Sequence, residues 1–196
     1  METGNFGDKV IDWATREFDT PHLNLGCGSD YHENAINVDI NKSVAADVYV
    51  DLQHTPWPWK HSTFELIEAH HILEHLDPVP WDELNRVLKP NGILDITYPI
   101  GHTRFEDPTH SQYWNVNTAE MLVGNRKHGH EAPLSDFVIV SATVEWSIPH
   151  RIRKWRTKWK VAIHGPGPWM GQVPGLYGEV HVIYRKTIEE EHGDTP

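Results

Sequence analysis

The strongest constraint on the fold is a short apolar segment that runs into two closely spaced glycines. His22–Leu25 carries leucine at every second position, and Gly26 and Gly28 follow directly. This pattern predicts a buried strand that ends in a tight turn. Glycines in such a turn let the backbone approach a ligand where a side chain would collide.

Similar strand patterns recur along the chain and are separated by helical or turn-rich stretches. Helices are expected at Val10–Phe18 and Asp82–Leu88, and a third is expected to start at Asn117–Glu120. Lys89–Gly92, with its proline and glycine, should end the second helix. The later strands are expected at Ala35–Asp39, Asp47–Val50, Phe64–Ala69, Ile93–Tyr98, Phe137–Trp146 and Glu179–Arg185. This order predicts an α/β sheet that is parallel in its first half and has an antiparallel edge.

Two carboxylates stand at the ends of expected strands, where ligands bind in open α/β sheets. Asp39 ends the second strand and is placed to accept hydrogen bonds from a ribose diol. Asp51 follows the third strand, and its carboxylate together with Leu52 suits an adenine ring. The chain lacks the GxxxxGK[ST] phosphate loop of nucleotide hydrolases. Only 13 positions separate Gly26 from Asp39, short of the roughly 20 of dinucleotide sites, which disfavours NAD.

As an ordered set, these segments resemble the class I S-adenosylmethionine (SAM)-dependent methyltransferases, in particular small methyltransferase domains with type-11-like motifs. The resemblance covers Leu23–Pro99 and extends more weakly through Asp107–His110 to Leu176–Lys186. The matching segments are LNLGCG (Leu23–Gly28), INVDI (Ile36–Ile40), Asp51-Leu52, PWPWKHSTFELI (Pro56–Ile67), HHILEHL (His70–Leu76) and ELNRVLKPNGILDITYP (Glu83–Pro99).

The resemblance implies a Rossmann-like, doubly wound sheet of seven strands, mostly parallel with an antiparallel edge. It implies a single SAM-binding domain over residues 1–188, in which residues 20–100 form the cofactor half and residues 101–188 the acceptor side. Residues 189–196 are expected to be a disordered acidic tail. The cofactor-binding residues that it implies are Gly26, Cys27, Gly28, Asp39, Ile40, Asp51, Leu52 and His70.

The chain departs from the family pattern at three places. Glu65 stands where an aspartate is usual. Asn91-Gly92 replaces a glycine pair, and asparagine tolerates the left-handed conformation that this turn requires. The short gap between Gly28 and Ile36 leaves little room for the first crossover helix, which we expect to be trimmed to a turn.

A rival hypothesis comes from the run His71-Ile72-Leu73-Glu74-His75, which matches the H-x-x-E-H pattern of a class of zinc peptidases. On a helix, His71 and His75 would share one face and bind zinc, with Glu74 as the general base. We rank this zinc hydrolase below the methyltransferase, for which no metal is expected. A third hypothesis is a SAM-binding domain without catalytic activity.

The methyl acceptor is expected to lie against the long polar segment Tyr98–Asn115, because long loops in compact domains are often functional. Removal of a proton from an oxygen or nitrogen acceptor needs a base. The candidate catalytic residues, in order, are His110, His71 and Asp107. We expect the acceptor to be a small molecule, a glycan or a nucleotide-type compound.

Charge and composition narrow the partners. The formal net charge of −11 argues against a general nucleic-acid binder. The basic segment Arg151–Lys160 is the exception, because an amphipathic helix there could face a nucleic acid or another anionic acceptor, or a lipid surface. We do not favour these alternatives. We expect an exposed helix over Arg151–Trp159 whose tryptophans pack on the sheet. No apolar run is long enough to span a membrane, and no signal-peptide pattern is visible. With a single cysteine, Cys27, the simplest expectation is a cytoplasmic protein.

Overall fold

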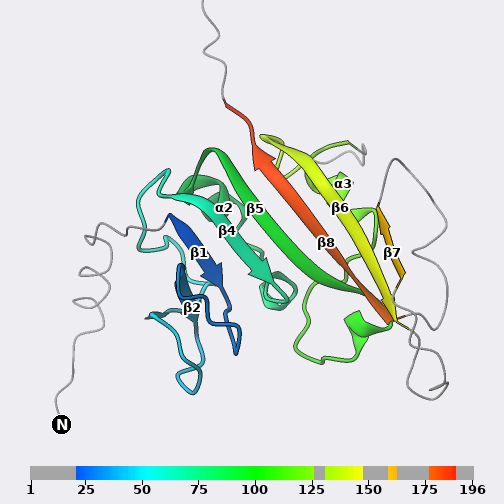
Figure 1. Ribbon diagram of the computed structural model, residues 1–196, viewed down its shortest axis with the longest axis horizontal. Coiled ribbons are helices and arrows are strands. Elements are labelled where there is room, and N and C mark those ends of the chain that lie inside the picture. The colour runs from blue at the N-terminus through cyan, green and yellow to red at the C-terminus, as the bar shows by residue number, and fades with distance from the viewer. Residues whose placement is uncertain (1–20, 126–130, 148–158, 163–176, 189–196) are drawn as a thin grey trace, which may run out of the picture.

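The described part of the chain forms one twisted eight-stranded sheet (Figure 1). The computed structural model describes residues 21–125, 131–147, 159–162 and 177–188. The strand order is β3-β2-β1-β4-β5-β8-β6-β7. Within these ranges, no helix has the length and apolarity needed to cross a membrane.

The first five strands pair with one another in parallel. β1 pairs with β2 on one side and with β4 on the other, so the order of the sheet reverses at β1. In open α/β sheets, ligands bind at such a switch point, beyond the carboxyl ends of the strands. The five strands are β1 (His22–Leu25), β2 (Ile36–Asp39), β3 (Val48–Tyr49), β4 (Phe64–His70) and β5 (Leu88–Gly101).

The remaining three strands form the expected antiparallel edge. β8 (Tyr177–Lys186) pairs with β5 and with β6 (Phe137–Ser147), and β7 (Trp159–Ala162) pairs with β6. All seven expected strands are therefore present, and β7 is an eighth. The helix expected over Arg151–Trp159 does not include its last residue, since Trp159 opposes Trp146 in the sheet. Residues 151–158 lie outside the described residues.

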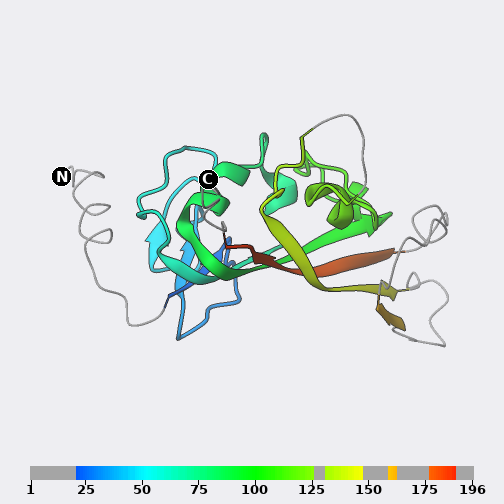
Figure 2. The ribbon, with the colours of Figure 1, turned by 90° about the horizontal axis from the view of Figure 1, so that it is seen from above.

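The described helices are short, and α2 and α3 lie on the same face of the sheet (Figure 2). They are η1 (Leu73–His75), α2 (Trp81–Val87), η2 (Thr103–Phe105) and α3 (Thr118–Leu122). The connection between β1 and β2 contains only turns, as its length predicts. The helix expected at Val10–Phe18 lies outside the described residues.

The hydrophobic core lies between the sheet and these helices. Leu94, Ile96 and Tyr98 alternate along β5 and are fully buried. The Tyr98 hydroxyl donates a hydrogen bond to the carbonyl of Asn115. Asp95 and Thr97, which have the opposite parity on β5, are only partly buried. Strand alternation therefore gives this sheet one apolar face and one polar face.

Helix α2 ends at Val87, and β5 begins directly after it with a β-bulge. Leu88 pairs with Phe64, and the next pair is Ile93 with Leu66, so Lys89–Gly92 loop out of the ladder. Asn91 has a φ of +63°, the left-handed conformation that the sequence predicts there.

Helix α2 is tied to the proline-containing loop before β4 by a buried ion pair. Arg86 contacts the Glu83 carboxylate through two nitrogens, each at 2.6 Å. Glu83 also accepts the backbone N–H of Trp57 at 2.6 Å, and Arg86 donates to the carbonyls of Trp57 and Trp59. These contacts explain the Glu-x-x-Arg spacing, because residues three apart on a helix lie on one face.

Candidate functional site

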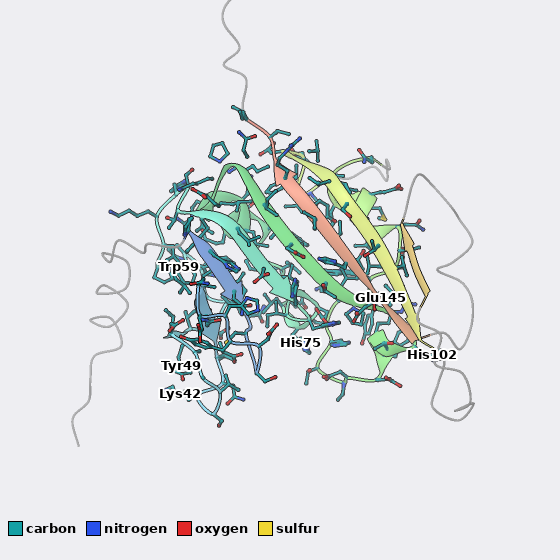
Figure 3. All side chains as sticks on the ribbon, in the orientation of Figure 1. Lys42, Tyr49, Trp59, His75, His102 and Glu145 are labelled. Carbon is teal, nitrogen blue, oxygen red and sulfur yellow. The ribbon has the colours of Figure 1, made fainter. Side chains whose placement is uncertain are left out.

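The residues of interest gather where the parallel strands end. Figure 3 shows Lys42, Tyr49 and His75 along the edge of the sheet toward which β1, β2 and β4 point. Two hollows occur at this edge among the described residues, one beyond β2 and β3 and one beside η1.

The glycine turn after β1 has the conformation that only glycine adopts readily. Gly26 and Gly28 have φ values of +62° and +52°. A Cβ atom on Gly26 would lie 2.6 Å from Cγ1 of Ile72, so the turn packs tightly against the segment after β4. A Cβ atom on Gly28 would have only the Gly26 carbonyl oxygen nearby, at 4.0 Å. The backbone at Gly28 is therefore open to a ligand.

Asp39 is fixed beside this turn. The Gly28 N–H donates to its Oδ2 at 2.8 Å, and the Asn41 N–H donates to its Oδ1 at 2.7 Å. Each carboxylate oxygen still has a free acceptor position. Cys27 is buried between the two glycines, and burial followed by the charge of Asp39 raises the pKa of its thiol. The thiol therefore stays protonated.

A hollow of about 340 Å³ lies at the ends of β2 and β3, next to Asp39 in the chain. Ile40, with 63% of its surface exposed, and Asp51 both line it. Asp51 accepts the Gln53 N–H and pairs with His54. Leu52 does not line this hollow: it is buried in the core, and its carbonyl accepts from the Trp57 indole.

His70 has partners that the sequence does not single out. Its Nε2 lies 3.2 Å from Oδ1 of Asp95, and Nε2 of His181 lies 2.6 Å from the same oxygen. These three side chains come from β4, β5 and β8 and gather on the polar face of the sheet. The structure thus places Gly26, Cys27, Gly28 and Asp39 together, Ile40 and Asp51 beside them, and His70 in a separate group.

The second hollow, of about 460 Å³, contains all three candidate catalytic residues. We call it the η1 pocket. It is lined by His71, Glu74, His75, Pro99, Thr103, Glu106, Asp107, Pro108 and His110.

His71 is held between two carboxylates. Its Nε2 lies 3.1 Å from Glu179, and its Nδ1 lies 3.4 Å from Glu74. The hydrogen bond to Glu179, then the charge contact with Glu74, raises the pKa of His71 to about 9 against the opposing effect of burial. His71 is therefore a cation at neutral pH and has no lone pair with which to accept a proton.

Asp107 is also committed to local contacts. It accepts the Thr109 N–H at 2.8 Å and the Thr109 hydroxyl at 2.6 Å. These two hydrogen bonds lower the pKa of Asp107, which makes its carboxylate a weaker base.

His110 differs from the other two candidates because one ring nitrogen is free. Its Nδ1 lies 2.9 Å from the Arg104 carbonyl. A carbonyl only accepts, so Nδ1 carries the proton and Nε2 keeps its lone pair. This Nε2 faces Glu74, at 4.0 Å from Oε1.

The H-x-x-E-H run does not form the helical zinc site of the rival hypothesis. η1 is a single 3-10 turn of three residues, and His71, with a φ of +53°, lies before it. His71 contacts Glu179, whereas His75 contacts Thr109. The two histidines therefore do not share a helical face. Glu74 and His75 instead lie close to His110.

No known protein family and no curated protein matches the sequence. Solved structures, in contrast, match over almost the whole chain. A SAM-dependent methyltransferase from Archaeoglobus fulgidus is 14% identical with a TM-score of 0.54, and the match covers 93% of this chain and 95% of that one.

Two further structures give the same result. For a SAM-dependent methyltransferase from Thermotoga maritima the identity is 12% and the TM-score 0.56, over 93% of this chain and 89% of that one. For the YcgJ protein of Bacillus subtilis the identity is 12% and the TM-score 0.53, over 94% and 100%. The chain therefore has the class I methyltransferase fold.

Proposed function

We propose that this protein is a SAM-dependent methyltransferase acting on an oxygen or nitrogen of a small-molecule or glycan acceptor. The observation that carries the proposal is the carboxylate of Asp39, fixed by the Gly28 N–H at the switch point of a methyltransferase-type sheet. Such a carboxylate is suited to a ribose diol.

The residues beyond β1 and β2 fit this cofactor. The open space at Gly28 leaves room for a ligand against the backbone, and Asp39 keeps free acceptor positions. Asp51 and the exposed Ile40 offer an acceptor and an apolar surface for an adenine. When bound, SAM would supply the methyl group.

The η1 pocket is proposed to hold the acceptor. Its volume of about 460 Å³ is typical of small-molecule sites. Of the three candidate bases, His110 is the best placed to take a proton, because its Nε2 is free and its side chain is only 7% exposed. The cationic His71 would attract an electron-rich acceptor. The net charge of −11 disfavours long polyanionic acceptors.

A radiolabel experiment tests the proposed activity. The chain is incubated with methyl-labelled SAM and separate small-molecule, nucleic-acid and protein fractions of a cell extract. We expect label in the small-molecule fraction, with loss of labelling in Asp39→Ala and a strong decrease in His110→Asn. Label in the nucleic-acid fraction would contradict the acceptor class. Binding of SAM without transfer to any fraction would favour the inactive SAM-binding domain.

A further inference from the structure

Three side chains that can bind a metal ion converge in the η1 pocket. Glu74 and His75 come from η1, and His110 comes from the loop after η2. One candidate ligand atom of each lies within 4.8 Å of the other two. The rings of His75 and His110 pack with centroids 4.7 Å apart. Figure 3 shows His75 close to the end of β4.

Glu74 is buried without a hydrogen-bond donor. Its side chain is 1% exposed, and neither carboxylate oxygen accepts a hydrogen bond from the described residues. A buried carboxylate in this state is costly unless a cation approaches it. The nearest candidate, His71, lies 3.4 Å from Oε1 but also contacts Glu179. His71 therefore leaves Oε2 of Glu74 without a partner among the described residues.

The hydrogen bonds of the two histidines leave a lone pair on each ring. His110 donates from Nδ1 to the Arg104 carbonyl. The single hydroxyl proton of Thr109 goes to Asp107, so Thr109 accepts from Nδ1 of His75. In the neutral form of each ring, Nε2 is then the nitrogen that carries the lone pair. Metal-binding histidines are typically held in this way, with the other ring N–H donated to a carbonyl or to a carboxylate-linked group.

With His110 neutral, its contact with Glu74 joins two acceptors that face each other. Nε2 of His110 and Oε1 of Glu74 are 4.0 Å apart, and no proton lies between two such atoms when both are acceptors. Two ligands of a tetrahedral zinc ion lie about 3.3 Å apart. The distance between these two atoms would thus have to shrink by only about 1 Å or less for both to bind the same ion.

We propose that Glu74, His75 and His110 bind a divalent transition-metal ion in the η1 pocket. Two imidazoles and one carboxylate are ligands typical of Zn²⁺ and of iron or manganese, and they disfavour Mg²⁺. Three protein ligands leave at least one position open to water or another molecule, as in catalytic zinc sites.

Metal binding itself does not depend on the proposed methyl transfer. If that function holds, the open position would take the acceptor's oxygen or nitrogen, and the ion would lower the pKa of that group. His110 would then act as a ligand instead of a base. This second step rests on the proposed function, whereas the binding site rests only on the geometry.

Zn²⁺ titration of the metal-stripped full chain, followed by calorimetry, tests the site. We expect one tight binding event, and a loss of at least about 100-fold in its affinity in Glu74→Gln and His110→Asn. Thr109→Val removes only the contact that orients His75 and should weaken the same event by about 10-fold to 100-fold. Mg²⁺ should not compete.

Two other groups of histidines and carboxylates provide matched controls. His22, His32 and Glu68 form one, and His70, Asp95 and His181 form the other. His32→Asn and His181→Asn should leave the tight event unchanged. Survival of that event in both Glu74→Gln and His110→Asn, or its loss in His181→Asn, would overturn the proposal.

Urea unfolding distinguishes a ligand from a structural residue. Without metal, the difference in unfolding midpoint between the wild type and Glu74→Gln gives the cost of losing the contact between Glu74 and His71. Added Zn²⁺ should raise the unfolding midpoint of the wild type only. A Glu74→Gln variant that still gains stability from Zn²⁺ would contradict the site. Binding of S-adenosylhomocysteine by chelator-treated protein would show that the cofactor binds without a metal ion in the η1 pocket.

Discussion

Among single residues, the two glycines after β1 share a backbone conformation but differ in their surroundings. Both have a positive φ, which costs an alanine about 1–2 kcal/mol. Only at Gly26 would the new methyl group also collide with Ile72. We expect Gly26→Ala to lower the free energy of unfolding by about 3 kcal/mol, because overpacking adds to the backbone cost. Gly28→Ala should cost about 1 kcal/mol.

Urea unfolding of the two variants measures this difference, with the wild type beside them. The turn is rigid at Gly26 and open at Gly28 only if the first substitution costs more. Equal losses, or a greater loss at Gly28, would show that the space in front of Gly28 is filled.

At the same scale, the sequence points to some site residues and not to others. Gly26, Gly28 and Asp39 lie at strand ends that can be read from the local pattern, and the structure brings them together. Asp95 and His181 are 86 positions apart. Their meeting depends on the register between β5 and β8, which local periodicity does not specify. The exposure of His71 and the burial of Glu74 depend on long-range packing in the same way.

At the level of elements, the Glu83–Arg86 pair holds α2 against the loop before β4. Both side chains are mostly buried, at 10% and 18% exposure. Removal of one partner leaves the other charge uncompensated, so we expect Glu83→Gln to cost about 3 kcal/mol of unfolding free energy. Glu65→Gln is the control, because its pair with Lys89 is exposed and should contribute less than about 1 kcal/mol.

Thermal and urea unfolding of these two variants check the expectation. We also expect Glu83→Gln to change the fluorescence of Trp57, because the backbone N–H of Trp57 donates to the Glu83 carboxylate. Similar stabilities for Glu83→Gln and Glu65→Gln would mean that the pair is replaced by water without loss.

Element boundaries show where local patterns fall short. Leu88 is the last residue of the expected helix, yet it pairs with Phe64 and begins β5. Trp159 fits an amphipathic helix by its spacing from Trp155, but it lies in β7 opposite Trp146. In both cases pairing with a distant strand overrides the helical preference, which is a weak effect for any single residue.

For the whole molecule, acid should weaken the fold in a defined way. Burial alone would raise the pKa of Asp95, but the hydrogen bonds from His181 and His70 outweigh burial and hold it at about 2. This pKa is lower in the folded chain than the usual value of 3.8. The ionised carboxylate therefore stabilises the fold at any pH above about 4. This contribution, about 2 kcal/mol, is lost as the pH falls from about 4 to 2.

The measurement is the free energy of unfolding of the wild type and His181→Asn between about pH 5 and pH 2. The variant should be less stable at the higher pH and should lose less on acidification, since one of the groups that lower the Asp95 pKa is gone. Parallel losses in the two proteins would show that Asp95 does not contribute to the acid sensitivity.

The architecture as a whole is the level at which the sequence is most informative. The order of strands and turns predicts an α/β sheet with an antiparallel edge, and the structure has this arrangement. The placement of α2 and α3 on one face of the sheet does not follow from the pattern (Figure 2). The turn-only link after Gly28, in contrast, follows from its length, which leaves no room for a helix between β1 and β2.

The proposed function requires cofactor binding beside Asp39, and calorimetric titration of S-adenosylhomocysteine into the purified chain tests this binding. We expect saturable binding by the wild type that Asp39→Ala abolishes and that a chelator leaves unchanged. Asp30→Ala is a suitable control, because its exposed carboxylate has no part in the proposed site. Absence of binding by well-folded wild type, or undiminished binding by Asp39→Ala, would contradict the proposed function.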